Sequence, residues 1–260
     1  MNLAKRVVHK IKRELISVAG PKRNCNVCGT SFRGKFIPLS DMYFQKTREA
    51  GYPYTADDAE TINYREYECP VCHCSDRDRL YALYLESHLE KNKKYKLLDI
   101  APAQALREKL QKNSLIQYRS SDLFMEDVDD KIDLMDMNIY PDGSFNIFIC
   151  SHVLEHVPDD IRAMRELYRV LSQDGFGIAM VPIVLPLKEI DEDIHVTDIK
   201  ERWRRFGQGD HVRLYSKKGF VERLQKTGFK VTEITIKDFS LEDFILHGIS
   251  PKSVIYIVAK

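Results

Sequence analysis

Apolar residues follow two different periodicities along the chain of 260 residues. From about residue 80 to the C-terminus, short apolar runs alternate with segments whose apolar residues recur at helical spacing. This alternation predicts an α/β fold with a mostly parallel sheet that is covered by helices on both faces. We expect the strands at 96–100, 115–119, 131–135, 145–150, 175–181, 229–236 and 252–259.

The clearest helical pattern spans residues 159–171. Its apolar residues share one face, and an acidic residue at its start can cap the helix. These residues are Ile161, Met164, Leu167 and Leu171, with Asp159 or Asp160 as the cap. The last two expected strands have no crossover helix of normal length between them, so we expect an antiparallel pair at the edge of the sheet.

Residues 1–20 have the pattern of a basic amphipathic helix that ends at Gly20 and Pro21. Its apolar positions are Leu3, Val7, Ile11 and Leu15, with Lys and Arg between them. A terminal helix of this kind usually packs on its own domain, and we favour that interpretation. Peripheral contact with an anionic membrane surface is the alternative.

Composition narrows the class of protein. No apolar run approaches the roughly 20 residues of a membrane-spanning helix, and no apolar secretory segment follows the initial Met. We therefore expect a cytoplasmic protein with reduced thiols. The net charge of +1 predicts no strongly basic surface, so nucleic acid is not the expected partner.

Two C-x-x-C motifs lie in the segment 21–78, which has little helical periodicity; they are Cys25-Asn-Val-Cys28 and Cys69-Pro-Val-Cys72. Two such turns can bring four thiolates to one tetrahedral point. The spacing predicts a zinc-ribbon-like module with a structural Zn²⁺ ion and a small strand excursion within 29–68. A closed four-thiolate site has no open coordination position, so this zinc would hold structure and not perform chemistry.

Other roles for the cysteines remain open. Disulfides are disfavoured by the expected reducing compartment, and a redox dithiol is disfavoured because two pairs are present. His73 and Cys74 lie beside the second motif, and either could replace a zinc ligand. Cys150 ends an apolar run, so we expect a buried thiol in the core.

Three acidic residues follow successive expected strands: Asp99, Asp122 and Asp136. In a doubly wound sheet, ligands bind at the carboxyl ends of the strands. An acid about 20 residues beyond the first turn is placed to accept from a ribose hydroxyl, and Asp122 has this spacing from Asp99. The first turn, however, reads Ala101-Pro102-Ala103 where a nucleotide-binding turn usually carries glycines.

Residues 140–183 read YPDGSFNIFICSHVLEHVPDDIRAMRELYRVLSQDGFGIAMVPI and resemble the class I S-adenosylmethionine-dependent methyltransferases, type 11-like. In outline the resemblance extends from about residue 80 to the C-terminus. It implies a Rossmann-like seven-stranded sheet with a reversed last hairpin, which agrees with the strands expected above. Residues 79–260 would then form a methyltransferase domain behind the cysteine module.

The resemblance also implies which residues hold the cofactor S-adenosylmethionine. Asp99, Ala101 and Pro102 would lie near its methionine part, Asp122 and Leu123 at its ribose, Asp136 and Met137 at its adenine, and Ser151 and His152 on its other side. Three positions depart from the family pattern. Ala101 and Ala103 replace glycines, and Asn146 replaces an aspartate. Because this cofactor has no pyrophosphate, small methyl groups at the turn can leave room for it, with reduced affinity as one consequence.

The long segment 183–215 is expected to be a substrate-side insertion, because loops of this length in a compact domain are usually functional. It carries His195, Trp203, Asp210, His211 and Arg213. His211 is the candidate catalytic base for an alcohol acceptor, with Asp210 as a neighbour and Arg213 as a contact for an anionic group. A structural or solvent-exposed role for His211 is the alternative, and we expect a structural role for His156.

The sequence therefore predicts a methyltransferase that methylates an oxygen of a small-molecule acceptor, such as a sugar or nucleotide-sugar. An RNA methyltransferase with a zinc module is one alternative. A binding or scaffold protein that kept the fold and lost the cofactor is the other.

Overall fold

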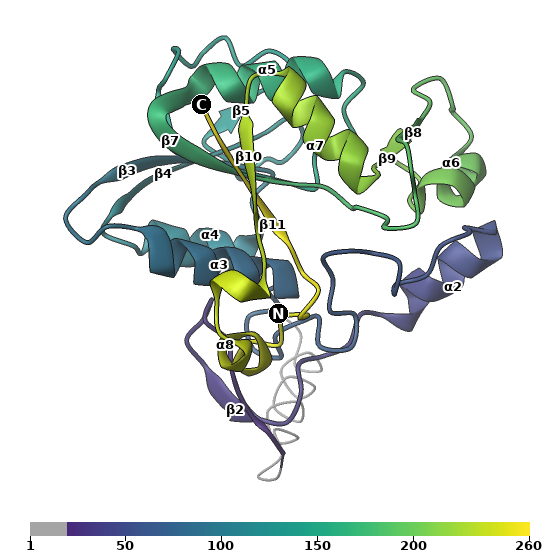
Figure 1. Cartoon of the computed structure of the whole chain (residues 1–260), viewed down its shortest axis with the longest axis horizontal. Coiled ribbons are helices and arrows are strands. Elements are labelled where there is room, and N and C mark those ends of the chain that lie inside the picture. The colour runs from purple at the N-terminus through teal and green to yellow at the C-terminus, as the bar shows by residue number, and fades with distance from the viewer. Residues whose placement is uncertain (1–19) are drawn as a thin grey trace.

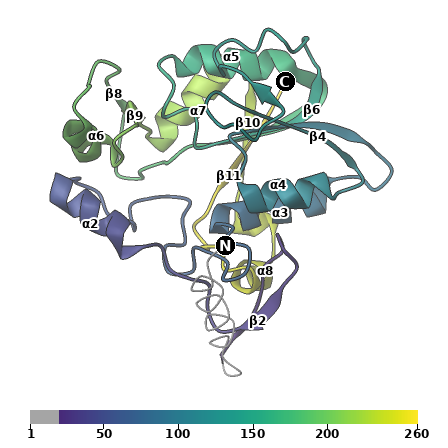
Figure 2. The ribbon, with the colours of Figure 1, turned by 180° about the vertical axis from the view of Figure 1, so that it is seen from behind.

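The computed structural model describes residues 20–260, so the helix expected over residues 1–20 lies, apart from Gly20, outside the described residues. The described chain forms three layers (Figures 1 and 2). Helices α3 (Asp76–His88) and α4 (Gln104–Gln111) cover one face of a central sheet, and α5 (Asp160–Val170) and α7 (Lys217–Lys226) cover the other.

The central sheet has seven strands in the order β10-β11-β7-β6-β3-β4-β5. Their bounds are β3 Tyr95–Ile100, β4 Ile116–Asp122, β5 Asp130–Lys131, β6 Phe145–Ser151, β7 Leu171–Met180, β10 Lys230–Ile234 and β11 Ile255–Ala259. Strand β11 is antiparallel to both of its neighbours, and the other pairings are parallel. The α/β class, the mostly parallel sheet and the antiparallel C-terminal pair are thus confirmed.

The centre of the sheet is apolar on both faces, as parallel strands between two helical layers require. Leu97 and Leu98 of β3 and Ile147 and Phe148 of β6 are fully buried. Gly177 of β7 lies directly against the Phe148 ring, because a Cβ atom there would come within 2.1 Å of it.

Helix α5 begins as its sequence pattern predicts. The Asp159 side chain accepts a hydrogen bond of 2.9 Å from the Arg162 N–H, which satisfies one free donor of the first turn. Helix α3 starts at Asp76, where Ser75 and Asp78 form a reciprocal capping box.

Strand β5 is the element that differs most from its expected range of 131–135. It pairs only at Asp130 and Lys131. The chain then turns, because the Asp133 side chain accepts from the Met135 N–H at 2.8 Å and the Asp133 carbonyl accepts from the Asp136 N–H at 2.9 Å. An aspartate that bonds its own following backbone competes with a strand ladder.

The segment before α3 holds a short hairpin and a helix. Strands β1 (Lys22–Asn24) and β2 (Ser31–Arg33) pair antiparallel, and β2 is the strand excursion expected within 29–68. Helix α2 (Asp41–Ala50) was not predicted, because it buries only Thr47 and so has no apolar stripe. The short helices η1 (Ile236–Asp238) and α8 (Leu241–Leu246) connect β10 to β11.

The insertion 183–215 has structure of its own and contacts α2. Strands β8 (Asp191–Glu192) and β9 (Arg213–Leu214) flank helix α6 (Ile199–Phe206), which lies beside α2 in Figures 1 and 2. The ring centroids of Tyr43 and Trp203 are 6.4 Å apart, and the Lys46 ammonium lies 5.7 Å from the Trp203 ring. Helices α2 and α6, which are far apart in sequence, therefore pack against each other on one side of the molecule.

A buried arginine ties the first segment to the rest of the protein. Arg79 of α3 is completely buried, and its guanidinium lies 3.8 Å from the Phe36 ring. Its nitrogens donate to the backbone carbonyls of Glu66, Tyr67, Cys74, His247 and Gly248 at 2.5–3.3 Å. One planar side chain thus joins the cysteine region, α3 and the turn after α8.

We expect Arg79→Lys to lower the free energy of unfolding by about 3 kcal/mol, because one ammonium cannot reach carbonyls that the forked guanidinium serves together. Urea unfolding followed by circular dichroism measures the change. The control is Arg165→Lys on the exposed face of α5, which should shift stability by less than about 0.5 kcal/mol. Equal shifts in the two variants would contradict this role of Arg79.

Candidate active site

The carboxyl ends of β3, β4 and β6 lie at one edge of the sheet. Ile100 of β3 pairs with Ser121 of β4 and with Cys150 of β6. The next residue of each strand, namely Ala101, Asp122 and Ser151, therefore lies on one level at this edge. The sequence analysis expected Asp122 at this edge from its position after a strand, and expected Ala101 and Ser151 there from the family resemblance.

The turn after β3 keeps the backbone conformation that glycine favours, although its residues are not glycines. Ala101 has a φ of 53°, in the left-handed region, and its N–H donates to the Ser121 carbonyl at 2.8 Å. An L-residue in this region costs about 1–2 kcal/mol relative to the right-handed conformation. His152, which directly follows the neighbouring strand β6, has a φ of 58°. Strained backbone of this kind concentrates at functional sites.

Asp99 lies below this turn and is buried. It accepts a hydrogen bond of 2.8 Å from the Tyr118 hydroxyl. Pro102 is also buried, whereas Ala103 is exposed and begins the approach to α4. Asp99 and Pro102 therefore support the turn from inside, and Ala101 is its partly exposed residue.

Asp122 ends β4 and holds the next turn. Its Oδ1 accepts from the N–H groups of Phe124 and Met125 at 2.6 and 2.7 Å, and Oδ2 makes no hydrogen bond with the described residues. Leu123 is 46% exposed and Phe124 is 82% exposed, so an apolar surface adjoins this carboxylate.

Asp136 and Met137 are neighbours in sequence but lie in different surroundings. Asp136 is exposed, whereas the Met137 side chain is fully buried. The Met137 N–H donates to the Glu166 carboxylate at 2.8 Å, and its carbonyl accepts from Arg169 at 2.9 Å. This turn is thus anchored from the α5 side.

Ser151 and His152 contact residues of α3 that the sequence analysis did not identify. The Ser151 and Tyr81 hydroxyls are 2.8 Å apart. Arg77 Nη1 donates to His152 Nε2 at 2.6 Å, which leaves the proton of this imidazole on Nδ1. Burial, and then the Arg77 charge, lower the pKa of His152 to about 4.

A cavity of about 330 Å³ opens beside His152. The segment before α3, the end of β7 and the insertion all contribute to its walls. Its aromatic lining consists of Tyr43, Phe44, Tyr52, Tyr54, Tyr67 and Phe206, and its polar lining includes Arg48, Arg77, His152, Gln208 and His211. Sequence reasoning placed the insertion here but missed the contribution of residues 39–67, since nothing local connects that segment to the insertion.

His211 lines the cavity and is almost fully buried. Its Nδ1–H donates to the Phe206 carbonyl at 3.2 Å. Burial lowers the pKa of His211, although the nearby Glu155 carboxylate opposes this shift. The imidazole is therefore neutral near pH 7, with Nε2 as its acceptor atom.

The other polar residues of the insertion have different surroundings. His195 is exposed. Arg213 is buried, and it donates to Glu192 and to the carbonyls of the turn that precedes α5, namely those of Leu154, Val157 and Pro158. Arg213 therefore fixes this turn from below.

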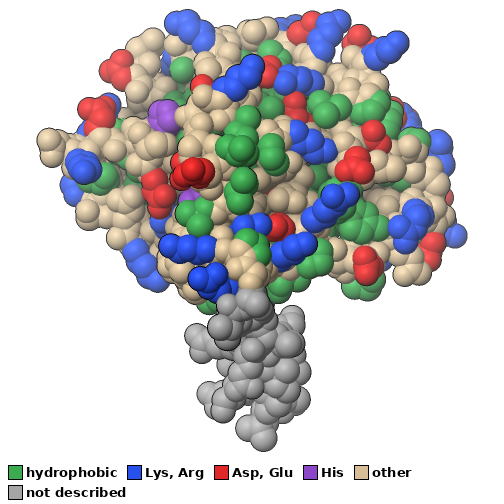
Figure 3. Space-filling model, turned by 60° about the horizontal axis from the view of Figure 1, so that its bottom comes forward, with side chains coloured by type: hydrophobic (Ala, Val, Ile, Leu, Met, Phe, Trp, Pro, Cys, Tyr) green, Lys and Arg blue, Asp and Glu red, His purple; other side chains and the backbone are tan. Residues whose placement is uncertain are grey.

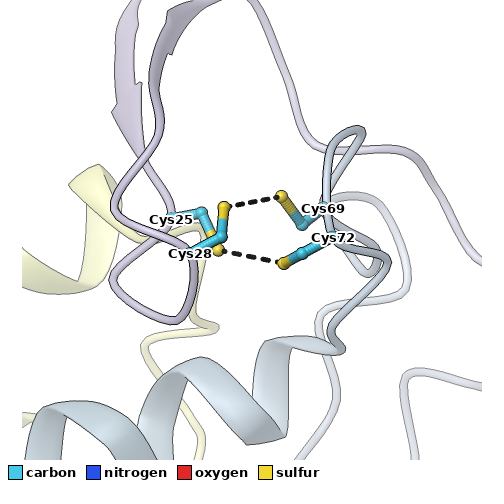
Figure 4. Close-up of side chains that lie close together, drawn as sticks. All are labelled: Cys25, Cys28, Cys69 and Cys72. Atoms are coloured by element: carbon cyan, nitrogen blue, oxygen red, sulfur yellow. Dashed lines mark hydrogen bonds between the residues drawn. The ribbon is translucent and has the colours of Figure 1, made fainter. Parts of the chain in front are cut away.

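The cysteine motifs face each other across two loops (Figure 4). The sulfur atoms of Cys25, Cys28, Cys69 and Cys72 all lie within 4.8 Å of one another. The Cys25–Cys72 and Cys28–Cys69 separations are 3.7 and 4.0 Å. A tetrahedral zinc site with Zn–S bonds of about 2.3 Å has sulfur–sulfur edges of about 3.8 Å, so the donor set fits this ion.

Two further cysteines lie outside the four-cysteine cluster. Cys74 is buried, with its sulfur 3.4 Å from that of Cys25, as a fifth thiol beside the cluster. Cys150 is fully buried in β6, as expected. All the cysteines are described and free of disulfides.

No helix among the described residues is long and apolar enough to cross a membrane.

Several solved structures are similar to this chain at low sequence identity. One chain of the Haloferax volcanii complex that contains the methyltransferase activator Trm112 is 14% identical, with a TM-score of 0.48, covering 71% of this chain and 90% of that one. A SAM-dependent methyltransferase from Archaeoglobus fulgidus is 14% identical, with a TM-score of 0.45 and coverages of 73% and 96%. The [4+2]-cyclase SpnF is 15% identical, with a TM-score of 0.45 and coverages of 86% and 97%.

No curated protein matches the chain. The sequence profile of the family described as "Methyltransferase domain" matches residues 76–234, which is more than half of the chain and includes every strand of the sheet except β11. The matched range contains the turn at Ala101, the acids that follow the strands and the HVLEHV segment. The chain therefore belongs to the methyltransferase-domain family.

Proposed function

We propose that this protein transfers a methyl group from S-adenosylmethionine to an oxygen of a small polar acceptor, such as a sugar or nucleotide-sugar. The observation that carries the proposal is the glycine-like turn at Ala101, which lies level with Asp122 and Ser151 while His152 borders the aromatic cavity. A cofactor edge and an acceptor cavity thus meet at one strand end.

The residues at the sheet edge fit the cofactor. Ser121 Oγ is buried without a hydrogen-bond partner among the described residues, and Asp122 Oδ2 is uncommitted. In the proposal, Asp122 and Leu123 hold the ribose, and Asp99, Ala101 and Pro102 lie near the methionine part. Ser151 and His152 line the other side. Asp136 can reach the adenine edge, and the buried Met137 would support that edge from beneath.

When bound, S-adenosylmethionine supplies an electrophilic methyl group on a sulfonium. As the methyl–sulfur bond breaks, a methyl–oxygen bond forms and the acceptor hydroxyl loses its proton. The chain must hold the acceptor in line and exclude water. His211 is the proposed base, because its neutral imidazole lines the cavity and Nε2 can accept this proton.

The chemistry of the cavity favours a polar molecule with an apolar face. Tyrosine and phenylalanine rings offer flat surfaces for a sugar or base, and tyrosine hydroxyls offer hydrogen bonds. Arg48 and Arg77 can bind an anionic group such as a phosphate. These features suit a nucleotide-sugar, and transfer of a labelled methyl group to a panel of sugars and nucleotide-sugars tests the acceptor class.

RNA is the weaker alternative. On the face drawn in Figure 3, Lys, Arg, Asp and Glu side chains are interspersed, without a continuous basic stripe. Proteins that bind the nucleic-acid backbone usually present such a stripe. The small net charge of +1 agrees with a small-molecule acceptor.

Zinc is the ion that we propose for the four-cysteine cluster, as a structural ion in a cytoplasmic protein. In this proposal residues 21–78 form the zinc-ribbon-like module, residues 79–260 the methyltransferase domain, and 183–215 its acceptor-side insertion. The module would also contribute to the acceptor cavity, because α2 and the residues after it supply the aromatic walls.

Calorimetric titration with S-adenosylhomocysteine should show saturable one-to-one binding. We expect Asp122→Ala to weaken binding about 10- to 100-fold, the effect of losing a charged hydrogen bond of about 1.5–3 kcal/mol. Glu126→Ala is the matched control, since that side chain is 87% exposed and forms an ion pair with Lys131 on the surface. Absence of binding in a folded sample would favour the scaffold alternative.

The stability of the protein should depend on the protonation of Asp99. Burial raises the pKa of this carboxyl to about 7, with a further increase from Asp78 of α3, while the Tyr118 hydroxyl of β4 and Arg107 of α4 lower it; the Cys150 thiol of β6 lies on the remaining side. The folded state thus binds a proton that the unfolded state has already released above pH 4.

Stability should therefore fall as the pH rises from about 4 to about 7. Between pH 5 and pH 8, the wild type should lose about 2–3 kcal/mol more than Asp99→Asn, which has no such proton. Urea unfolding of both proteins at the two pH values measures the difference, and the variant cancels the contribution of every other titrating group. Parallel pH profiles would show that Asp99 does not carry the effect.

Removal of zinc should loosen the first segment. We expect a strong chelator, or Cys28→Ser, to lower the melting temperature and to increase proteolysis within residues 21–75, because bound metal contributes directly to folding. Mass spectrometry of the native protein should show one zinc ion, lost in Cys28→Ser. Cys150→Ser, at a thiol far from the cluster, should keep the ion.

A further inference from the structure

A second group of metal-binding side chains lies away from the cysteines. Ligand atoms of Glu155, His156 and His211 all lie within 4.8 Å of one another. Glu155 and His156 belong to the turn between β6 and α5, and His211 belongs to the insertion. The Val212 N–H donates to the Glu155 carbonyl at 3.0 Å, so the two segments are held together by backbone.

Glu155 is the unusual member of this group. Its side chain is completely buried, and neither carboxylate oxygen accepts a hydrogen bond from the described residues. Oε1 lies 3.2 Å from His152 Nδ1 and 3.9 Å from His156 Nε2, without hydrogen-bonding alignment. A buried carboxylate that lacks a well-aligned hydrogen bond is costly. The Nδ1–H group of His152 is the nearest donor and offsets this cost only in part, which indicates that a cation belongs beside Glu155.

Both histidines direct their other ring nitrogen to an oxygen. His211 Nδ1 donates to the Phe206 carbonyl, and His156 Nδ1 lies 3.5 Å from the Asp210 carboxylate. Metal-ligating histidines usually have such a partner, because it fixes the tautomer and leaves the second nitrogen free for the ion. The rings are nearly perpendicular, with centroids 4.7 Å apart.

We propose that Glu155, His156 and His211 bind a divalent transition-metal ion next to the acceptor cavity. Two imidazoles and one carboxylate suit Mn²⁺, Fe²⁺, Co²⁺ or Zn²⁺ better than Mg²⁺ or Ca²⁺, which prefer oxygen ligands alone. His152 is not a ligand, because Arg77 occupies its Nε2. Three protein ligands leave open coordination positions for solvent or substrate.

The role of this ion in acceptor binding rests on the proposed function, because His211 lines the cavity. An acceptor oxygen that binds the ion would be held in place and made more acidic. The lone pair of His211 would then be used by the metal, and the hydroxyl proton would leave to solvent instead of to His211. Presence or absence of the ion therefore decides between two ways of deprotonating the acceptor.

The test uses the full-length protein with zinc in its cysteine cluster, titrated with Co²⁺. We expect one additional Co²⁺ per chain, with weak visible bands and no strong near-ultraviolet band of thiolate-bound cobalt. Glu155→Gln and His211→Ala should each weaken Co²⁺ binding at least about 100-fold, since even partners of metal ligands contribute 10- to 100-fold. His195→Ala, an exposed histidine of the same insertion, should bind as the wild type does.

Two results would overturn the proposal: no saturable Co²⁺ beyond the thiolate site in the wild type, or unchanged affinity in Glu155→Gln. Circular dichroism verifies that each variant folds, and His156→Ala, with a side chain 33% exposed, replaces any variant that does not. S-adenosylhomocysteine binding is measured in parallel. Loss of that binding with Co²⁺ retained would contradict the proposed function and leave the metal site standing.

Discussion

The arrangement of the candidate active site depends on the hydrogen bonds that the Arg79 guanidinium donates. It is a buried cation whose donors meet backbone carbonyls before α3 and after α8. Carbonyls that accept from one rigid fork cannot move independently of one another. The cysteine region is thereby fixed to the methyltransferase domain, and α2 is held where it meets α6 of the insertion.

This attachment gives the cysteine region a direct part in the site. The cavity beside His152 takes its aromatic walls from Tyr43, Tyr52 and Tyr67 as well as from Phe206 of the insertion. A module that held only its own fold would not line a cavity at the end of the sheet. In the proposed function, residues 39–67 would therefore help to select the acceptor.

Three residues in or near the turn between β6 and α5 have different roles. Arg213 supports the turn through its carbonyls, His152 borders the cavity, and Glu155 is buried without an aligned hydrogen bond from the described residues. An apolar side chain at a buried position is often more stable than a charged one. The buried charge of Glu155 therefore points to a function. His152 links these features, because it lines the cavity and its Nδ1 lies 3.2 Å from the Glu155 carboxylate.

The sequence alone determined the α/β class, the parallel core and the positions of Asp99 and Asp122 near strand ends, because strand periodicity and strand direction are local properties. It also determined the cysteine cluster, through two short motifs. Only the tertiary structure decided that α2 meets α6 and that Glu155 joins His211. Those contacts link segments far apart in the chain and depend on packing, which leaves no periodic pattern in the sequence.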